Sequence, residues 1–261
     1  MSISKDQHPI ETGMGPRPEP QETLNGIDLS GKTVLVTGGY SGIGLETVRA
    51  LVKAGAQVHV PARRVAQART MLDGIVAPAH IGEMDLGDLT SVQKFAADFL
   101  SQNDRLDILI GNAAVMACPL DHTAQGFESQ IGINHFGHFM LVNGLMPALQ
   151  SAGQSDGARI VLLSSVGHRI GGIDFDDMHF KNRPYDKWQS YGQSKTAKAL
   201  QAVELDRRGQ SDNIRSFSVH PGGIFTPLQR HLANEEMVAL GWTNEDGSPS
   251  ELAAAGFKTP P

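Results

Sequence analysis

The sequence predicts an α/β fold built on a doubly wound parallel sheet. Short apolar segments alternate with helix-forming segments along most of the 261 residues, and strands that alternate with helices in this way pair in parallel. The second observation is a glycine-rich turn that directly follows the first apolar segment. The third is that small or polar residues follow several apolar segments, as expected where ligands bind at the carboxyl ends of strands.

Composition indicates a soluble protein with one large domain. The length fits one α/β domain, and the 40% of hydrophobic residues suffice for a core. The net charge of −6 and the lack of a basic run argue against nucleic acid as a partner. No apolar run approaches the roughly 20 residues of a membrane-spanning helix. Cys118 is the only cysteine, so no internal disulfide can form, which is compatible with the cytoplasm.

The N-terminal segment differs from the rest of the chain. Residues 1–24 are polar and rich in proline, and they contain no apolar signal-peptide core. We therefore expect a flexible arm over residues 1–27 and a single α/β domain over residues 28–261.

A glycine-rich turn connects the first predicted strand, residues 33–36, to the first predicted helix, residues 45–54. Its glycines are Gly38, Gly42 and Gly44. Glycine allows a sharp turn and the close approach of a phosphate, and the free amides at the start of a helix favour negative charge. The turn therefore predicts a cradle for dinucleotide phosphates. The alternative is a tight strand-to-helix turn without a ligand.

The second predicted strand, residues 57–60, ends in Pro61-Ala62-Arg63-Arg64. At this strand end a dinucleotide site meets the adenosine ribose, and an acidic residue there would repel a 2′-phosphate. Here two guanidinium groups stand instead, and guanidinium groups suit a phosphate. The pattern favours NADP over NAD. The alternative is that both arginines begin a solvated helix.

The remaining elements continue the alternation. Further strands are predicted at residues 75–84, 106–110, 159–163 and 214–219, and the first of these is expected to be irregular because of Pro78 and Gly82. Further helices are predicted at residues 92–100, at residues 126–149 and from Trp188 onward. The residues that follow the strands are Asp85-Leu86, Gly111-Asn112-Ala113-Ala114, Ser164-Ser165 and His220-Pro221-Gly222-Gly223.

Two histidines within the predicted helix at residues 126–149, His135 and His138, have the spacing of a metal-ligand pair. No carboxylate or cysteine partner is evident in the sequence, so we interpret them as histidines packed within a helix and predict no metal site. A metal-dependent hydrolase built on this pair would lack ligands.

Tyr191 and Lys195 are four residues apart and so share one face of a helix. A free tyrosine titrates near ~10 and is a poor acid–base group at neutral pH. An ammonium group one turn away would lower that pKa, and the tyrosine could then exchange a proton with an alcohol oxygen. A serine near the strand end, Ser165, could hold that oxygen. The alternative is two exposed helix residues.

Six motifs occur in an order that resembles the short-chain dehydrogenase/reductase family, over roughly residues 28–232. They are Thr37-Gly38-x-x-x-Gly42-Ile43-Gly44, Gly111-Asn112-Ala113-Ala114, Asn134, Ser164-Ser165, Tyr191-x-x-x-Lys195 and Pro221-Gly222. One branch of the family fits best, the branch that includes retinol dehydrogenases, protochlorophyllide reductases and the WW-domain oxidoreductase. The sequence resembles this branch at residues 133–141 and 163–168 and in the long gap between Ser165 and Tyr191. The resemblance implies a Rossmann fold and, for most of this branch, NADP.

The resemblance implies a set of catalytic residues at the positions of this sequence that match the family's motifs. Tyr191 would be the general acid in reduction and the base in oxidation, and Lys195 would lower its pKa and bind the nicotinamide ribose. Ser165 would hold the substrate oxygen. Asn134 would fix a helix distortion and a water that links Lys195 to solvent. Ser164 is the rival serine, and because strand neighbours point to opposite faces only one of the two can serve.

The resemblance also implies the residues that contact NADP(H). Asp85 would contact the adenine and Asn112 the ribose beside it, while Pro221, Gly222 and Thr226 would flank the nicotinamide. The full implied set is Gly38, Ser41, Gly42, Ile43, Gly44, Arg63, Asp85, Leu86, Asn112, Ala113, Tyr191, Lys195, Pro221, Gly222 and Thr226.

The sequence departs from the family pattern at two places. Ala114 replaces the more usual glycine, which is a mild change. After residues 231–240, which are expected to form part of a substrate lid, no seventh strand is visible. The strand at residues 214–219 is then expected to be an exposed sheet edge.

These observations predict an NADP-dependent oxidoreductase that transfers hydride between the nicotinamide and a carbonyl or alcohol carbon of a small apolar substrate. A non-catalytic NADP-binding regulator or scaffold is the alternative, and the presence of both Tyr191 and Lys195 argues against it. The sequence predicts no nucleic-acid partner and no membrane span, and it leaves a homo-oligomer open. Fold analogy does not name the substrate.

Overall fold

In the computed structural model, which describes residues 12–15 and 18–258, five parallel strands form the central sheet in the order β2-β1-β3-β4-β5. The strands are β1 (Thr33–Val36), β2 (Gln57–His59), β3 (Ile108–Gly111), β4 (Ala158–Leu163) and β5 (Ile214–Val219). The order runs outward in both directions from β1 and β3, which confirms the predicted doubly wound sheet.

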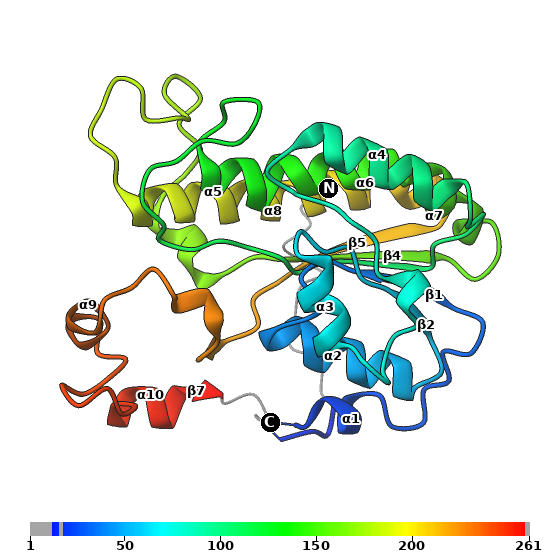
Figure 1. Cartoon of the computed structure of the whole chain (residues 1–261), viewed down its shortest axis with the longest axis horizontal. Coiled ribbons are helices and arrows are strands. Elements are labelled where there is room, and N and C mark those ends of the chain that lie inside the picture. Colours follow the sequence, from blue (N-terminus) through cyan, green and yellow to red (C-terminus); the bar gives the residue numbers. More distant parts are fainter. Residues whose placement is uncertain (1–11, 16–17, 259–261) are drawn as a thin grey trace.

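Helices cover both faces of this sheet (Figure 1). One face carries α2 (Gly42–Lys53) and α3 (Val65–Met71), and the other carries α4 (Leu89–Leu100), α6 (His138–Gly144), α7 (Met146–Gly153) and α8 (Lys187–Gly209). Because successive strand residues point to opposite faces, Val34 and Val36 pack under α2 while Leu35 packs on the other side. No helix in the described residues is long and apolar enough to cross a bilayer.

The strand predicted at residues 75–84 is wrong. The segment contains a 3₁₀ turn, η2 (Pro78–His80), and pairs with the end of β2 only through a single bridge between Ala62 and Glu83. Pro78 has no backbone N–H group to donate to a sheet ladder, and Gly82 has no side chain to pack and so weakens a strand. The segment therefore follows β2 through isolated hydrogen bonds, such as that from the Val60 amide to the His80 carbonyl at 2.9 Å.

The continuous helix predicted at residues 126–149 is also wrong in its details. The helical segment starts with α5 (Ser129–Ile131), continues through a π-helical turn, η3 (Gly132–Gly137), and then forms α6 and α7. The break before α7 coincides with Pro147 in its first turn, where a missing amide is tolerated.

The predicted N-terminal arm falls partly outside the described residues, at residues 1–11 and 16–17. Its last part differs from the expectation. A short helix, α1 (Pro20–Thr23), contacts α2, and Leu24 packs against the core beneath α2. Leu24 is apolar in an otherwise polar segment, which explains why the chain joins the domain there.

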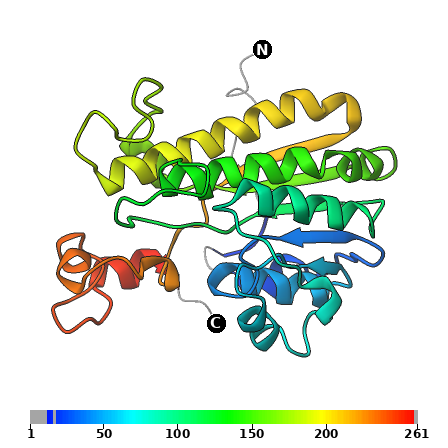
Figure 2. The ribbon, with the colours of Figure 1, turned by 45° about the horizontal axis from the view of Figure 1, so that its top comes forward.

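The last described residues, 223–258, form a C-terminal lobe that stands beside the domain (Figures 1 and 2). It contains β6 (Gly223–Ile224), η6 (Pro227–Gln229), α9 (Asn234–Ala239), α10 (Glu251–Gly256) and β7 (Phe257–Lys258). The short strand β7 pairs with β6 and not with the central sheet. The central sheet therefore lacks the usual seventh strand in the described residues, and β5 is its edge, with Phe217 45% and Val219 38% exposed.

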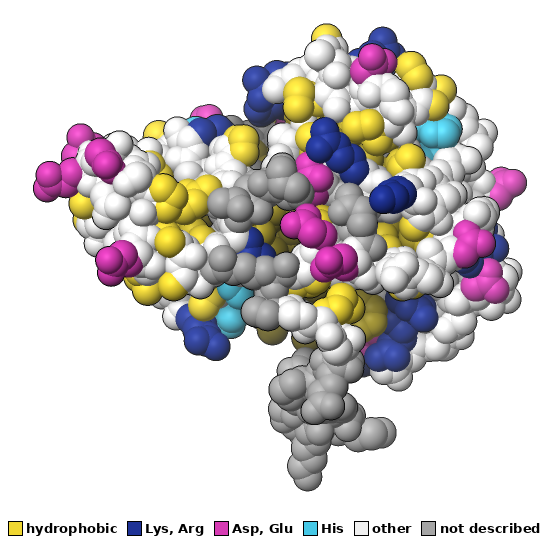
Figure 3. Space-filling view, turned by 90° about the horizontal axis from the view of Figure 1, so that it is seen from below, with side chains coloured by type: hydrophobic (Ala, Val, Ile, Leu, Met, Phe, Trp, Pro, Cys, Tyr) yellow, Lys and Arg dark blue, Asp and Glu magenta, His cyan; other side chains and the backbone are white. Residues whose placement is uncertain are grey.

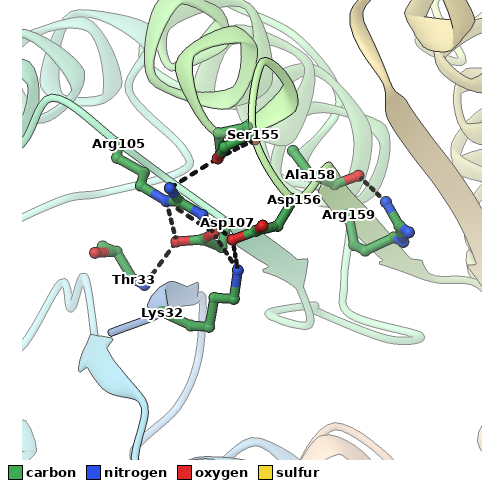
Figure 4. Close-up of polar contacts among 9 residues, drawn as sticks. Lys32, Thr33, Arg105, Asp107, Ser155, Asp156, Ala158 and Arg159 are labelled. Carbon is green, nitrogen blue, oxygen red and sulfur yellow. Dashed lines mark hydrogen bonds and ion pairs between the residues drawn. The ribbon is translucent and has the colours of Figure 1, made fainter. Parts of the chain in front are cut away.

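A network of charged side chains ties the strands together at their amino ends (Figure 4). Asp107, directly before β3, accepts hydrogen bonds from the Arg105 guanidinium at 2.9 Å and from the Thr33 amide at 2.9 Å. Lys32 lies 3.4 Å from the same carboxylate and 2.6 Å from Asp156, which precedes β4. Ion pairs thus hold the amino ends of the strands together, and the carboxyl ends of the strands remain available for a functional site.

Candidate active site

A cleft of about 550 Å³ lies at the carboxyl edge of the sheet, where the loops after the strands meet the C-terminal lobe. Figure 3 shows apolar side chains on both the lobe and the neighbouring part of the molecule. The cleft is lined by every residue predicted for the site except Gly44 and Asn134. The structure therefore brings together residues that are up to 188 positions apart in the sequence, from Gly38 to Thr226.

The glycine turn has the backbone that a phosphate cradle needs. Gly38 and Gly42 have φ angles of +66° and +51°, which side chains rarely allow. At Gly44 a Cβ atom would collide with the Gly38 carbonyl and lie 2.6 Å from the Asn112 amide. The helix α2 starts at Gly42, and the Ser41 side chain does not cap it. The first amides of α2 thus have no side-chain cap, which leaves them available to an anion.

The predicted adenosine end of the cleft is basic. Arg63 and Arg64 both line it, and neither forms an ion pair within the described part of the chain. Asp85 also lines this end, and its carboxylate accepts the Gly87 amide at 2.8 Å, which holds its orientation. Leu86 forms the adjacent apolar wall.

A buried hydrogen-bond chain supports the floor of the cleft. The Asn112 side chain donates to the Thr37 carbonyl at 2.9 Å, and the Ala113 amide donates to the Thr37 hydroxyl at 3.0 Å. His138 Nδ1 faces the Asn134 carbonyl at 3.0 Å and must carry a proton there, so Nε2 accepts from the Thr37 hydroxyl at 2.9 Å. Complete burial holds the pKa of His138 well below its usual value, so the imidazole is neutral.

The two serines after β4 point in different directions. The Ser164 hydroxyl donates to the main-chain carbonyl of Lys195 at 2.9 Å and is buried. Ser165 lines the cleft beside Tyr191, and its hydroxyl accepts the Gly167 amide at 3.1 Å. Burial raises the pKa of Tyr191, and a hydrogen bond with Ser165 opposes that effect. The geometry thus places Ser165, not Ser164, next to the phenol.

Lys195 is 2% exposed, and its ammonium group lies over the face of the Tyr191 ring. Its ammonium donates to the Leu163 carbonyl at 3.0 Å and is 5.4 Å from the centre of the Tyr191 ring. Burial lowers the pKa of Lys195 to about 8. Burial outweighs the other influences on Tyr191 and raises its pKa overall, so the lowered pKa expected for Tyr191 is not seen in this structure, and the effect of Lys195 on the phenol stays a prediction.

Asn134 lies behind the cleft and not in its wall. It sits in the π-helical turn η3, in agreement with the expected helix distortion. Its side chain exchanges two hydrogen bonds with the main chain of Val115, both at 2.9 Å, and donates to Ser194 at 3.0 Å. The water link from Asn134 to Lys195 stays a prediction. No group of three or more possible metal ligands occurs in the described part of the chain.

The nicotinamide side of the cleft is formed by the segment after β5. Pro221 and Gly222 line it, with Gly222 at a φ angle of +92°. The Thr226 hydroxyl accepts the Leu228 amide at 3.2 Å, and its methyl group lies against Gly42. The glycine cradle and the start of the lobe are therefore in direct contact.

Sequence reasoning missed two groups of residues near Tyr191. Lys198, fully buried, donates to the Gly111 carbonyl at 2.6 Å. Trp188 packs edge-on against Tyr191, with ring centres 6.4 Å apart, and against Trp242 of the lobe at 6.1 Å. Trp188, Tyr191, Lys195 and Lys198 are spaced by three or four residues, so helical periodicity could have placed them on one face of α8. No sequence signal pointed to Trp242.

Known proteins resemble this chain over most of its length. The family model described as short chain dehydrogenase matches residues 32–237. A probable oxidoreductase of Streptomyces antibioticus is 43% identical over 240 residues, which cover 90% of this chain and 78% of that protein. Human retinol dehydrogenase 12 is 39% identical over 221 residues, which cover 83% and 68%.

Solved structures agree with the sequence relatives. An uncharacterized protein from Mycobacterium paratuberculosis is 34% identical, with a TM-score of 0.67 over 90% of this chain and 82% of that one. The RhlG protein of Pseudomonas aeruginosa, solved as an NADP active-site complex, shares the fold at 24% identity and a TM-score of 0.64, over 87% and 88% of the two chains. The family match and the sequence relatives show that the chain belongs to the short-chain dehydrogenase/reductase family and is an oxidoreductase.

Proposed function

We propose that this oxidoreductase transfers hydride between NADP(H) and the carbonyl or alcohol carbon of a small, apolar substrate. The observation that carries the proposal is the position of the Tyr191 hydroxyl. It lies beside Ser165 and above the buried Lys195, in the cleft that also contains the glycine cradle. A proton donor and an anion site thus share one cleft.

The residues of the cleft fit a dinucleotide with a 2′-phosphate. The uncapped start of α2 suits the pyrophosphate, and Arg63 and Arg64 supply two guanidinium groups that no carboxylate in the described residues neutralises. Asn112 and Pro221 line the path between them and the nicotinamide end. When bound, NADP(H) supplies the hydride chemistry.

The protein's own part in the reaction is to position the substrate and to protonate the substrate oxygen. In the direction of reduction, Tyr191 donates its proton to the substrate oxygen while Ser165 holds that oxygen. The raised pKa of Tyr191 keeps the phenol protonated at neutral pH, as a general acid requires. Lys195, with a pKa of about 8, carries the positive charge that stabilises the phenolate left behind.

The surroundings of Tyr191 favour an apolar substrate. An apolar cluster lies around the phenol, to which the domain contributes Met116, Ala117 and Trp188 and the lobe contributes Leu228, Leu232, Met237 and Trp242. Such walls exclude water from the reacting atoms and bind hydrocarbon surface.

Replacement of Tyr191 by phenylalanine tests the catalytic part of the proposal. We expect turnover of carbonyl substrates to fall at least about hundredfold, because the proton donor is removed. NADPH binding measured by calorimetry should remain close to that of the wild type. Near-normal turnover in this variant would contradict the assigned chemistry, and NADPH binding without turnover in the wild type would instead favour a regulator or scaffold.

Replacement of Arg63 by alanine tests the cofactor part. Loss of a guanidinium that meets the 2′-phosphate should weaken NADPH binding about tenfold or more and leave NADH binding nearly unchanged. Calorimetric titration with both cofactors measures the difference. Equal losses for NADPH and NADH would show that Arg63 does not meet the 2′-phosphate.

A further inference from the structure

The imidazole of His138 lies between two parts of the candidate active site. His138 is the first residue of α6, directly after the π-helical turn η3, and its side chain is completely buried. It is not among the residues that line the cleft. Gly111, at the end of β3, leaves room for the ring, because a Cβ atom there would lie only 3.0 Å from Cδ2 of His138. The close packing indicates that the ring is held in one position.

One ring nitrogen of His138 contacts the cofactor side of the cleft. Nε2 lies 2.9 Å from the Thr37 hydroxyl, and that hydroxyl accepts the Ala113 amide at 3.0 Å. The Thr37 carbonyl accepts the Asn112 side chain at 2.9 Å. Thr37 comes directly before the glycine cradle, and Asn112 and Ala113 line the same cleft. The orientation of Thr37 therefore affects two segments of the predicted cofactor site.

The other ring nitrogen contacts the catalytic side of the cleft. Nδ1 of His138 lies 3.0 Å from the Asn134 carbonyl and 3.2 Å from the Ile133 carbonyl. Both carbonyls belong to the π-helical turn, which interrupts the regular α-helical hydrogen bonds. The Asn134 side chain donates to the Ser194 hydroxyl at 3.0 Å, and that hydroxyl donates to the Tyr191 carbonyl at 2.8 Å. Two further hydrogen bonds thus connect Asn134 to the main chain of Tyr191.

These contacts require a neutral imidazole in a single tautomer. Both neighbours of Nδ1 are carbonyl oxygens, so Nδ1 carries the proton and Nε2 accepts from the Thr37 hydroxyl. Burial, followed by the charges of Lys198 and Lys195, holds the pKa of His138 well below its usual value. The ring therefore stays neutral near pH 7 and keeps the bonds on both of its sides.

We propose that His138 is a positioning residue that connects the cofactor cradle to α8, the helix that carries Tyr191. Its Nε2 atom orients Thr37 beside the bound NADP(H). Its Nδ1 atom holds Asn134 in the π-helical turn, and the hydrogen bonds that follow support Tyr191. The inference rests on the proposed function, because it assumes that NADP(H) binds at the cradle and that Tyr191 protonates the substrate.

Two substitutions separate the roles of the two ring nitrogens. Asparagine places an amide nitrogen close to the position of Nδ1, so His138→Asn can keep the bond to Asn134 and loses the bond to Thr37. Glutamine places a carbonyl oxygen close to the position of Nε2, so His138→Gln can keep the bond to Thr37 and loses the bond to Asn134. Each variant should therefore disturb one side of the active site more than the other.

The test measures NADPH binding by calorimetry, and kcat with an aldehyde at saturating NADPH. His138→Asn should weaken NADPH binding about fivefold and lower kcat by a smaller factor. His138→Gln should lower kcat about fivefold and weaken NADPH binding by a smaller factor. Melting temperatures establish that each variant is folded at 25 °C. If each variant changes binding and kcat by equal factors, His138 only supports the fold and the proposal is overturned.

His135 provides the matched control, because it lies in the same π-helical turn and has the same side chain. Its ring packs against Phe136 and Phe139, with ring centres 5.1 and 6.0 Å apart. Within the described residues no hydrogen bond joins this ring to Thr37 or Asn134. His135→Asn and His135→Gln should therefore not split binding from kcat in opposite directions. The same split in the His135 variants would overturn the proposal.

Thr37→Val tests the contact from its other end and removes the need for a folded His138 variant. Loss of the hydroxyl should weaken NADPH binding by a larger factor than it lowers kcat, and NADPH binding equal to that of the wild type would overturn the proposal. Adding His138→Asn to Thr37→Val should weaken NADPH binding no further, because the bond between the two side chains is already lost. Additive losses would show that the two residues act independently, which contradicts the proposal.

Failure of the proposed function has a different signature. If the wild type binds NADPH but reduces no aldehyde, the assigned chemistry fails, and calorimetry with the His138 variants still tests the contact with Thr37. A larger loss of NADPH binding in His138→Asn than in His138→Gln would support that contact, and equal losses would overturn it. A wild type that does not bind NADPH would overturn the proposed function and this inference together.

Discussion

At the amino edge of the sheet the buried Asp107 carboxylate meets Arg105 and Lys32, whereas at the carboxyl edge the buried amines of Lys195 and Lys198 meet backbone carbonyl oxygens. Burial alone would raise the pKa of Asp107, but its hydrogen bonds with Arg105 and the Thr33 amide hold it below the usual value. Burial lowers the pKa of both lysines, and in the described residues no carboxylate forms an ion pair with either.

Buried charge thus has different effects at the amino ends and at the carboxyl ends of the strands. Paired ions at the amino edge favour the folded state, because the carboxylate is more acidic there than in the unfolded chain. The carboxyl edge carries a penalty: a pKa of about 8 for Lys195 against 10.5 corresponds to roughly 3 kcal/mol at neutral pH. Unpaired charge of this kind is typical of functional sites.

The largest expected effect is on turnover, from Lys195→Met. Removal of the ammonium should lower kcat at least about hundredfold, while the melting temperature at pH 7 should rise, because the buried charge is removed. Steady-state kinetics and thermal unfolding measure the two effects on the same sample. Lower activity together with lower stability would mean that Lys195 supports the fold, and the contrast between the two edges would fail.

Asp107→Asn should show the opposite behaviour. The change leaves Lys32 and Arg105 with the exposed Asp156 and is expected to cost about 2 kcal/mol of unfolding free energy. Turnover at 25 °C should stay close to that of the wild type. In the control Asp98→Asn the exposed pair with Lys94 is lost, which should cost less than about 0.5 kcal/mol in urea unfolding.

The smallest expected effect concerns Lys198→Met. At pH 6 the variant should be more stable than the wild type by about 1 kcal/mol, after the loss of the bond to the Gly111 carbonyl is included. The folded-state pKa of Lys198 lies well below 10.5, so wild-type stability should rise with pH until the unfolded chain also loses its proton near 10.5.

The stabilising effect of Lys198→Met should therefore vanish by about pH 10, which urea unfolding at several pH values can measure. Lys53→Met, at an exposed position, serves as control. An effect of Lys198→Met that is independent of pH would show that packing, and not charge, sets the difference between the edges.

Local sequence predicted the strands that form the sheet and the helices that start at recognisable residues. The apolar segments at β1, β4 and β5 appear within one residue of their predicted bounds. The segment at residues 75–84 failed because its apolar content resembles a strand while Pro78 and Gly82 prevent a regular ladder. The π-helical turn at Asn134 has no local propensity signal, since it depends on contacts with Val115 and Ser194.

The sequence by itself determined the glycine cradle, the pair of arginines and the spacing of Tyr191 and Lys195. Each of these depends on a few adjacent residues or on helical periodicity. Only the tertiary structure buried the Ser164 hydroxyl against the Lys195 carbonyl, buried Lys198 behind the cleft and placed Trp242 beside Trp188. These outcomes depend on which segments pack together over long sequence separations, and burial and pairing of charges follow from that packing.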